Sequence, residues 1–127
     1  MGPAVRPYID IPGLGDIVLE ESYVLGIAAS PGSLAIAADL VLAPGHPAYR
    51  PPPADESDCF VRGRLVFRDV RHLTWENQGA PPASDASGEL DYGHIDDLRR
   101  DGDIFELEGD WGNIRVIAAG VDLELEP

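Results

Sequence analysis

Residues 102–117 read GDIFELEGDWGNIRVI, and this stretch decides the fold class. Its first half alternates apolar and acidic side chains, which is the pattern of a strand with one buried face. The residues from Gly109 to Asn113 are typical of a tight turn around one tryptophan, and a second alternating segment follows. The stretch therefore predicts an antiparallel hairpin with Glu106 and Glu108 on its outward face.

Further segments typical of strands lie on both sides of this hairpin. Residues 17–29 and 34–42 are rich in Ile, Val, Leu and Ala, and the Ser-Pro-Gly-Ser sequence between them fits a type II turn. Residues 59–75 predict one long strand, or two strands with a bulge near Asp69. A final alternating strand is expected over residues 121–125.

Two shorter elements are expected near these strands. Residues 8–11 precede a Pro-Gly breaker and predict a short edge strand. The spacing of Ile95 and Leu98, followed by Asp-Gly, predicts one short helix near residues 94–100. At about two turns this helix needs tertiary packing for its stability.

The length and the loops predict one domain. A chain of 127 residues has the size of one ordinary domain. Clustered prolines predict a long surface loop at residues 43–58, and a second loop is expected at residues 76–88. Strands separated by turns favour a β fold over a βαβ fold. We therefore expect residues 1–127 to form a single all-β domain, either an antiparallel sandwich or an open barrel.

The charge of the chain is strongly one-sided. It holds 23 acidic residues against nine arginines and no lysine, for a formal net charge of −14. Nucleic-acid binding needs positive side chains that displace phosphate counterions, so we expect no nucleic-acid partner. The same sign disfavours binding to an anionic membrane surface. A basic protein partner would suit the charge, and solubility alone also explains it.

The sequence also predicts where the protein acts. Cys59 is the only cysteine, which excludes an intrachain disulfide and suits a reducing compartment. The N-terminal residues lack an apolar segment of signal-peptide length. The longest apolar run, residues 34–43, is too short to span a bilayer. These features predict a cytoplasmic protein.

No motif marks a catalytic site. The three histidines lack the close spacing of zinc ligands, and no Gly-x-Ser-x-Gly elbow, phosphate loop or dinucleotide motif is present. Glu106 and Glu108 have a separation that suits a glycosidase, but any solvated strand face produces the same spacing. We therefore predict no catalytic residue, no metal site and no cofactor, and we favour a protein that is not an enzyme. Residues that we single out as candidates for ligand or partner contact are His46, Tyr49, Tyr92, His94, Asp96, Glu106, Glu108 and Trp111.

Three arginines, Arg62, Arg64 and Arg68, lie on one face of a predicted strand. The simplest interpretation is cross-strand pairing with Glu106, Glu108 or Glu124. An anion-binding site is the functional alternative.

Three short strings in the second part of the chain, from Pro44 onward, resemble a known group of proteins. They are PGHPAY at residues 44–49, DYGHI at residues 91–95 and LEGDWG at residues 107–112. The chain resembles small, uncharacterised bacterial β-rich proteins, some of which look like immunity proteins of polymorphic toxin systems. The resemblance covers about half of the chain and rests on turn motifs. It implies a protein partner and no catalytic residues.

Three functions follow from these observations. The leading prediction is a non-catalytic, immunity-like module whose acidic surface binds a basic protein. The alternative is a small-molecule-binding or hydrolytic β-barrel that uses the His46 loop and the Tyr92–Asp96 segment. A homodimer joined through an exposed strand is a third interpretation.

Overall fold

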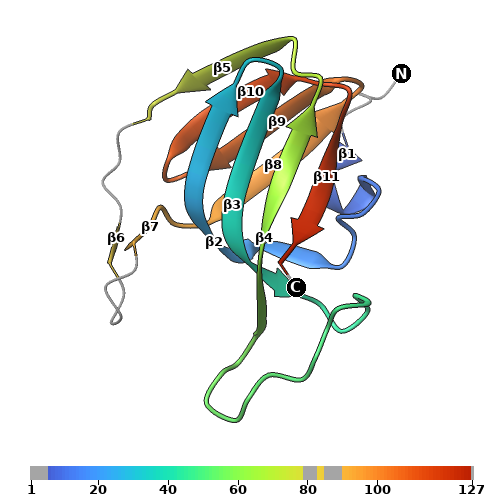
Figure 1. Cartoon of the computed structure of the whole chain (residues 1–127), viewed down its shortest axis with the longest axis vertical. Helices are drawn as coiled ribbons and strands as arrows, with labels where there is room; N and C mark the ends of the chain where they lie inside the picture. The colour runs from blue at the N-terminus through green and yellow to red at the C-terminus, as the bar shows by residue number, and fades with distance from the viewer. Residues whose placement is uncertain (1–5, 79–82, 85–89, 127) are drawn as a thin grey trace.

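The computed structural model of the chain describes residues 6–78, 83–84 and 90–126. Two antiparallel sheets pack face to face in the described part (Figure 1), and neither sheet closes on itself. The predicted all-β fold is confirmed, in the form of a sandwich. The elements are β1 (Arg6–Pro7), a 3-10 turn η1 (Tyr8–Asp10), β2 (Ile17–Ser30), β3 (Ser33–Leu42), β4 (Cys59–Arg68), β5 (His72–Glu76), β6 (Ala83–Ser84), β7 (Leu90–Asp91), β8 (Ile95–Asp101), β9 (Ile104–Gly109), β10 (Gly112–Ile117) and β11 (Gly120–Leu125).

The hairpin expected within residues 102–117 forms as predicted. Strands β9 and β10 pair in register, with Leu107 opposite Ile114 and Phe105 opposite Val116. They belong to a sheet with the order β1-β8-β9-β10-β5, which we call sheet A. The second sheet, sheet B, has the order β11-β4-β3-β2, and β6 and β7 form a separate small hairpin.

The core lies between the two sheets. Many of the side chains that face inward from the two sheets are completely buried, as is Leu14. Phe67 of sheet B and Phe105 of sheet A meet edge to face, with ring centroids 5.2 Å apart. Burial of one such side chain contributes about 1.5–3 kcal/mol. The alternation read from the sequence therefore has its physical origin in this shared interior.

The helix predicted near residues 94–100 is wrong, because these residues form the strand β8. The register of β8 against β9 shifts between Ile95 and Asp97. This irregularity lets Ile95 and Leu98 both point into the core although they are three residues apart. Three-residue spacing of buried side chains normally indicates a helix, and here a bulge in a strand produces it.

Two other segments also differ from the sequence prediction. The residues from Tyr8 to Asp10 form a 3-10 turn, and the edge strand β1 comes just before it. For residues 59–75 the alternative of two strands divided near Asp69 is confirmed, but the two strands are not joined by a bulge within one sheet, because β4 belongs to sheet B and β5 to sheet A. The chain crosses between the sheets at Asp69, whose φ of 52° lies in the left-handed region.

The long proline-rich loop at residues 43–58 is confirmed, since it contains neither helix nor strand. It extends beyond the end of the sandwich (Figure 1). The second predicted loop, residues 76–88, contains the short strand β6, and its remainder lies in part outside the described residues. No helix in the described part of the chain is long and apolar enough to cross a membrane.

Candidate functional interface

Three rings gather on the outer face of sheet B, and we call them the ring cluster: Tyr23, Phe60 and His94. The ring centroid of Tyr23 lies 4.6 Å from that of His94 and 6.0 Å from that of Phe60. Tyr23 is 38% exposed and Phe60 is 40% exposed. Large exposed rings in contact with one another are unusual on a surface that meets only water.

Backbone contacts hold His94 against strand β2. The amide of Val24 donates to the carbonyl oxygen of Gly93, and the amide of Tyr92 donates to the carbonyl oxygen of Val24, each at 2.8 Å. The imidazole Nδ1 of His94 lies 2.8 Å from the carbonyl oxygen of Ser22. Gly93 has a φ of +88°, a conformation that side chains with a Cβ rarely adopt. A glycine at this position therefore brings His94 beside Tyr23.

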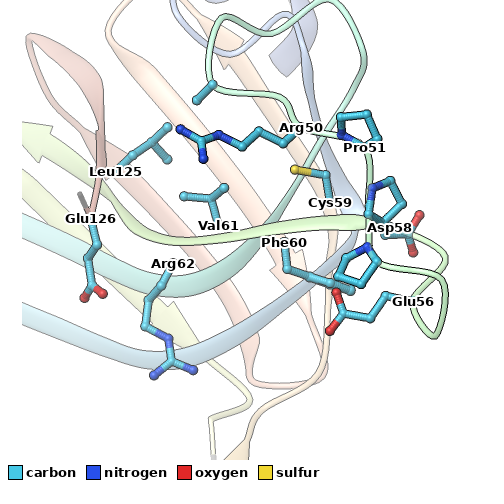
Figure 2. A pocket seen from close by; sticks show the side chains of 13 residues that line it. Arg50, Pro51, Glu56, Asp58, Cys59, Phe60, Val61, Arg62, Leu125 and Glu126 are labelled. Atoms are coloured by element: carbon cyan, nitrogen blue, oxygen red, sulfur yellow. The ribbon is translucent and has the colours of Figure 1, made fainter.

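An open pocket of about 720 Å³ adjoins Phe60, between the proline-rich loop, the beginning of β4 and the end of β11 (Figure 2). Its lining includes Cys59, Val61 and Leu125, which are partly buried and pack against the core. The proline-rich loop forms the opposite wall, and the side chain of Arg50 extends from this loop across the pocket toward Leu125 (Figure 2). The pocket therefore combines an apolar floor with two arginines, Arg50 and Arg62, and the three carboxylates of Glu56, Asp58 and Glu126.

Arginines and carboxylates alternate across the outer face of sheet B. Arg62 pairs with Asp39 at 2.9 Å, and Arg64 pairs with Glu124. A third pair joins Arg68 and Asp122 at 2.5 Å. The predicted pairing with Glu124 is thus confirmed for Arg64.

The prediction that Glu106 and Glu108 pair with these arginines is wrong, because both glutamates belong to sheet A. Their common partner there is Arg99, at 3.2 Å from each carboxylate, and Glu106 also lies 3.8 Å from Arg115. Asp97 lies 2.9 Å from the guanidinium group of Arg99. Partial burial lowers the pKa of Arg99, but the three carboxylates outweigh this effect and raise it above its ordinary value. The spacing that suggested a glycosidase therefore belongs to an ion-pair network.

The candidates His46 and Tyr49 take part in the local structure of the proline-rich loop. The amide of Ala48 donates to Nδ1 of His46 at 3.0 Å, and the ring of Tyr49 packs against the core. No hydrogen bond, ion pair or ring contact joins His46 to His94 or Asp96 within the described residues. The two segments proposed to line one cavity are thus not in contact through these side chains.

The remaining candidates are divided between the core and the surface. Trp111 is 3% exposed, and its indole Nε1 donates to the carbonyl oxygen of His94 at 3.2 Å. Tyr92 is partly buried against the core, whereas Asp96 is exposed. No group of three or more His, Cys, Asp or Glu side chains suited to a metal ion occurs among the described residues.

Sequence reasoning missed Tyr23, Phe60 and Arg50. A signal for Phe60 was present, because it has the same parity as Arg62 and Arg64 on one strand and must share their outward face. No comparable signal existed for Tyr23, because the register of β2 against β3 shifts on both sides of it. Its neighbours in space come from β4 and from the segment before β8.

The fold and the surface together define the protein as an antiparallel β-sandwich with an acidic exterior and a cluster of exposed rings beside an open pocket. No protein-family model, curated protein or solved structure matches the chain.

Proposed function

We propose that the protein is a non-catalytic binding module whose acidic surface binds a basic protein. The observation that carries the proposal is the ring cluster, in which Tyr23 and Phe60 expose apolar surface, and Phe60 lines a pocket together with the carboxylates of Glu56 and Asp58. Aromatic residues are enriched at the centres of protein interfaces and supply much of their binding energy. A protein partner would cover the rings and remove them from water.

The distribution of charge supports a basic partner. Six arginines form ion pairs within the described residues, and these pairs occupy only part of the acidic side chains. Carboxylates without an ion pair in this part of the chain include Glu21, Asp55, Glu56, Asp58, Asp96, Asp110 and Glu126. The unneutralised charge would steer a positively charged protein toward this surface.

The proposal has a more specific form, in which the module is an immunity protein that inactivates a toxin in the cytoplasm. The turn motifs that resemble such proteins favour it, and the acidic surface suits a basic toxin domain. A gene for a basic toxin beside the gene for this protein would support this form. Neighbouring genes that encode only acidic proteins would contradict it.

The first experiment is affinity capture from the source cell by the immobilised protein at low and at moderate salt. We expect a basic protein whose association rate falls as salt rises. The variant Phe60→Ser should weaken this association at least tenfold. Ile9→Ser is the matched control, because Ile9 is 54% exposed and belongs to the 3-10 turn η1. Equal effects of the two variants, or recovery of the protein alone, would contradict the proposal.

A small-molecule site is the second candidate function, and the pocket is the observation that favours it. Its apolar floor suits a ligand with an apolar part, and Arg50 would contact an anionic group of that ligand against the repulsion of Glu56, Asp58 and Glu126 in the same lining. Titration with the fluorescent naphthalene sulfonate ANS tests this, and Arg50→Ala should lower the affinity at least fivefold. Binding that Arg50→Ala leaves unchanged would place the dye elsewhere.

A further inference from the structure

Strand β11 is one of the two edge strands of sheet B. It pairs with β4 on one side and is the last strand in the order of the sheet (Figure 1). The amide of Glu126, just beyond β11, donates to the carbonyl oxygen of Arg62. Because hydrogen-bonded pairs alternate along an antiparallel ladder, the even-numbered residues of β11 direct their backbone groups toward β4. The N–H and C=O groups of Val121, Leu123 and Leu125 therefore point away from the sheet.

Edge strands usually carry features that prevent further pairing, such as proline, lysine, a bulge or an inward-pointing charge. Residues 120–125 contain neither proline nor lysine, and their register with β4 shows no shift. The inward-pointing side chains are Val121, Leu123 and Leu125, which are all apolar, and the last two are only partly buried. Among the described residues, the strand thus presents backbone groups without a hydrogen-bond partner together with incompletely covered apolar side chains.

The other edges of the sandwich are less suited to an added strand. Strand β1 is two residues long, and β2 already bonds to Tyr92 and Gly93 through Val24. Strand β5 is five residues long, and its outward positions carry the mixed set His72, Thr74 and Glu76. Only β11, among the edges that the structure describes, combines six residues with an acidic outer row.

The outer row of β11 selects the chemistry of the added strand. Asp122 and Glu124 pair with arginines of β4, yet 51% of the surface of each acidic side chain remains exposed in the folded protein. Glu126 continues the row beyond the strand and forms no ion pair with the described residues. Residues directly opposite each other on neighbouring strands interact, so basic residues on an added strand would continue the alternation of charge.

A second copy of the chain does not suit this edge. In antiparallel pairing of β11 with its own copy, side chains on the same outer face lie opposite one another. Asp122 and Glu124 would then face Asp122 or Glu124 of the second copy, and like charges directly opposite each other destabilise a sheet. A partner strand with basic residues removes this conflict.

We propose that β11 accepts an extended segment of the basic partner as an additional strand of sheet B. The segment has Arg or Lys at alternate positions, facing Asp122 and Glu124, and apolar residues between them, facing Leu123 and Leu125. Leu125 also lines the pocket that reaches Phe60 (Figure 2), so the added strand lies at the mouth of a hollow shared with the ring cluster. This inference rests on the proposed function, since it names the segment by which the partner binds.

The test uses a synthetic peptide of four Arg-Val repeats with blocked ends. We expect it to bind the full chain and to slow hydrogen exchange at the amides of Val121, Leu123 and Leu125. The amides of Asp122 and Glu124 are bonded to β4 and should be slow already in the free protein. A peptide with the same composition but with all arginines first, and a Glu-Val repeat, should bind at least tenfold more weakly.

A pair of variants separates the backbone of β11 from its side chains. Leu123→Pro removes an N–H group that the sheet does not use, whereas Leu123→Ala shortens the side chain and keeps this group. We expect Leu123→Pro to weaken the peptide at least tenfold relative to Leu123→Ala. Circular dichroism establishes that each variant is folded. If Leu123→Pro does not fold, the hydrogen exchange of the unaltered protein with and without the peptide decides whether the peptide pairs with β11.

The outcomes distinguish this inference from the proposed function. The proposal of an added strand is wrong if Leu123→Pro and Leu123→Ala bind the peptide with equal affinity. It is also wrong if the peptide does not slow hydrogen exchange at the amides of Val121, Leu123 and Leu125. If a captured basic protein then still depends on Phe60, the binding function stands without β11. If the immobilised protein captures no basic protein but the peptide binds as described, the edge is a strand acceptor and the proposed function fails.

Discussion

The hydroxyl of Ser22 bridges two strands where their backbone ladder is interrupted. Its Oγ donates to the carbonyl oxygen of Val18 at 2.8 Å and accepts from the amide of Val41 at 2.9 Å. Val18 faces Val41 and Tyr23 faces Asp39, so residues 19–22 of β2 lie opposite a single residue of β3. Ser22 is completely buried and supplies the hydrogen bonds that the backbone of this bulge lacks.

Replacing Ser22 with alanine should therefore destabilise the protein. The amide of Val41 would lose its acceptor inside the fold, at a cost of about 1–3 kcal/mol. Urea unfolding measures the change, and Ser57→Ala in the exposed proline-rich loop is the control. A loss no larger than that of the control would show that the bulge does not depend on this hydroxyl.

Strand β11 lies close against Gly63 of β4. A Cβ at Gly63 would meet the carbonyl oxygen of Glu124, and it would lie 3.1 Å from Leu125 Cδ2. We expect Gly63→Ala to lower the free energy of unfolding by about 1–3 kcal/mol. Gly26→Ala is the matched control, because a Cβ there has no neighbour within 4 Å. Thermal unfolding measures the stability of both variants. Equal unfolding temperatures of Gly63→Ala and Gly26→Ala would contradict this prediction.

The stability of the protein should fall at high pH because of Tyr8. Burial raises the pKa of Tyr8 from 10.0 to about 12, with a further contribution from a hydrogen bond to Glu20. The unfolded chain loses the phenolic proton more readily, so the contribution of Tyr8 is complete below about pH 10 and is lost as the pH rises toward 12.

Urea unfolding between pH 9 and pH 11.5 measures this effect, and Tyr8→Phe removes it. The variant should show a shallower decline of stability with pH than the unaltered protein. Parallel declines would mean that Tyr8 titrates normally in the folded state.

Trp111 connects the hairpin turn to the ring cluster. Trp111→Phe removes the indole N–H that donates to the carbonyl oxygen of His94. We expect a loss of about 1–2 kcal/mol, since the ring volume decreases and a partly buried carbonyl loses its donor. The resonances of the Tyr23 ring should also shift, because His94 lies against it. Unchanged Tyr23 resonances would show that Trp111 does not position His94.

The contrast between two strands explains how far sequence reasoning could reach. In β9 and β10 the side chains alternate without interruption, so both the pairing and the face of each residue were predictable. In β8 the bulge between Ile95 and Asp97 breaks the period, and the same reasoning gave a helix. Periodicity identifies a strand only where its partner strand has no register shift.

The candidate site was predictable only in part, for a related reason. Phe60 could be placed on the outward face from the parity of the arginines that follow it. The contact of Tyr23 with His94 depends on a backbone pairing between Val24 and Gly93 that no local pattern encodes. Sequence alone therefore selected His94 as a candidate and gave no indication of its neighbours.

The sequence by itself determined the all-β class, the acidic surplus and the long proline-rich loop, because these depend on local alternation, composition and the geometry of proline. Only the tertiary structure decided that residues 59–76 divide between two sheets, that Glu106 and Glu108 share Arg99, and that β11 is left as an edge. Strand order depends on pairings between segments far apart in the chain. The free energy of those pairings comes from one shared core, which no single segment contains.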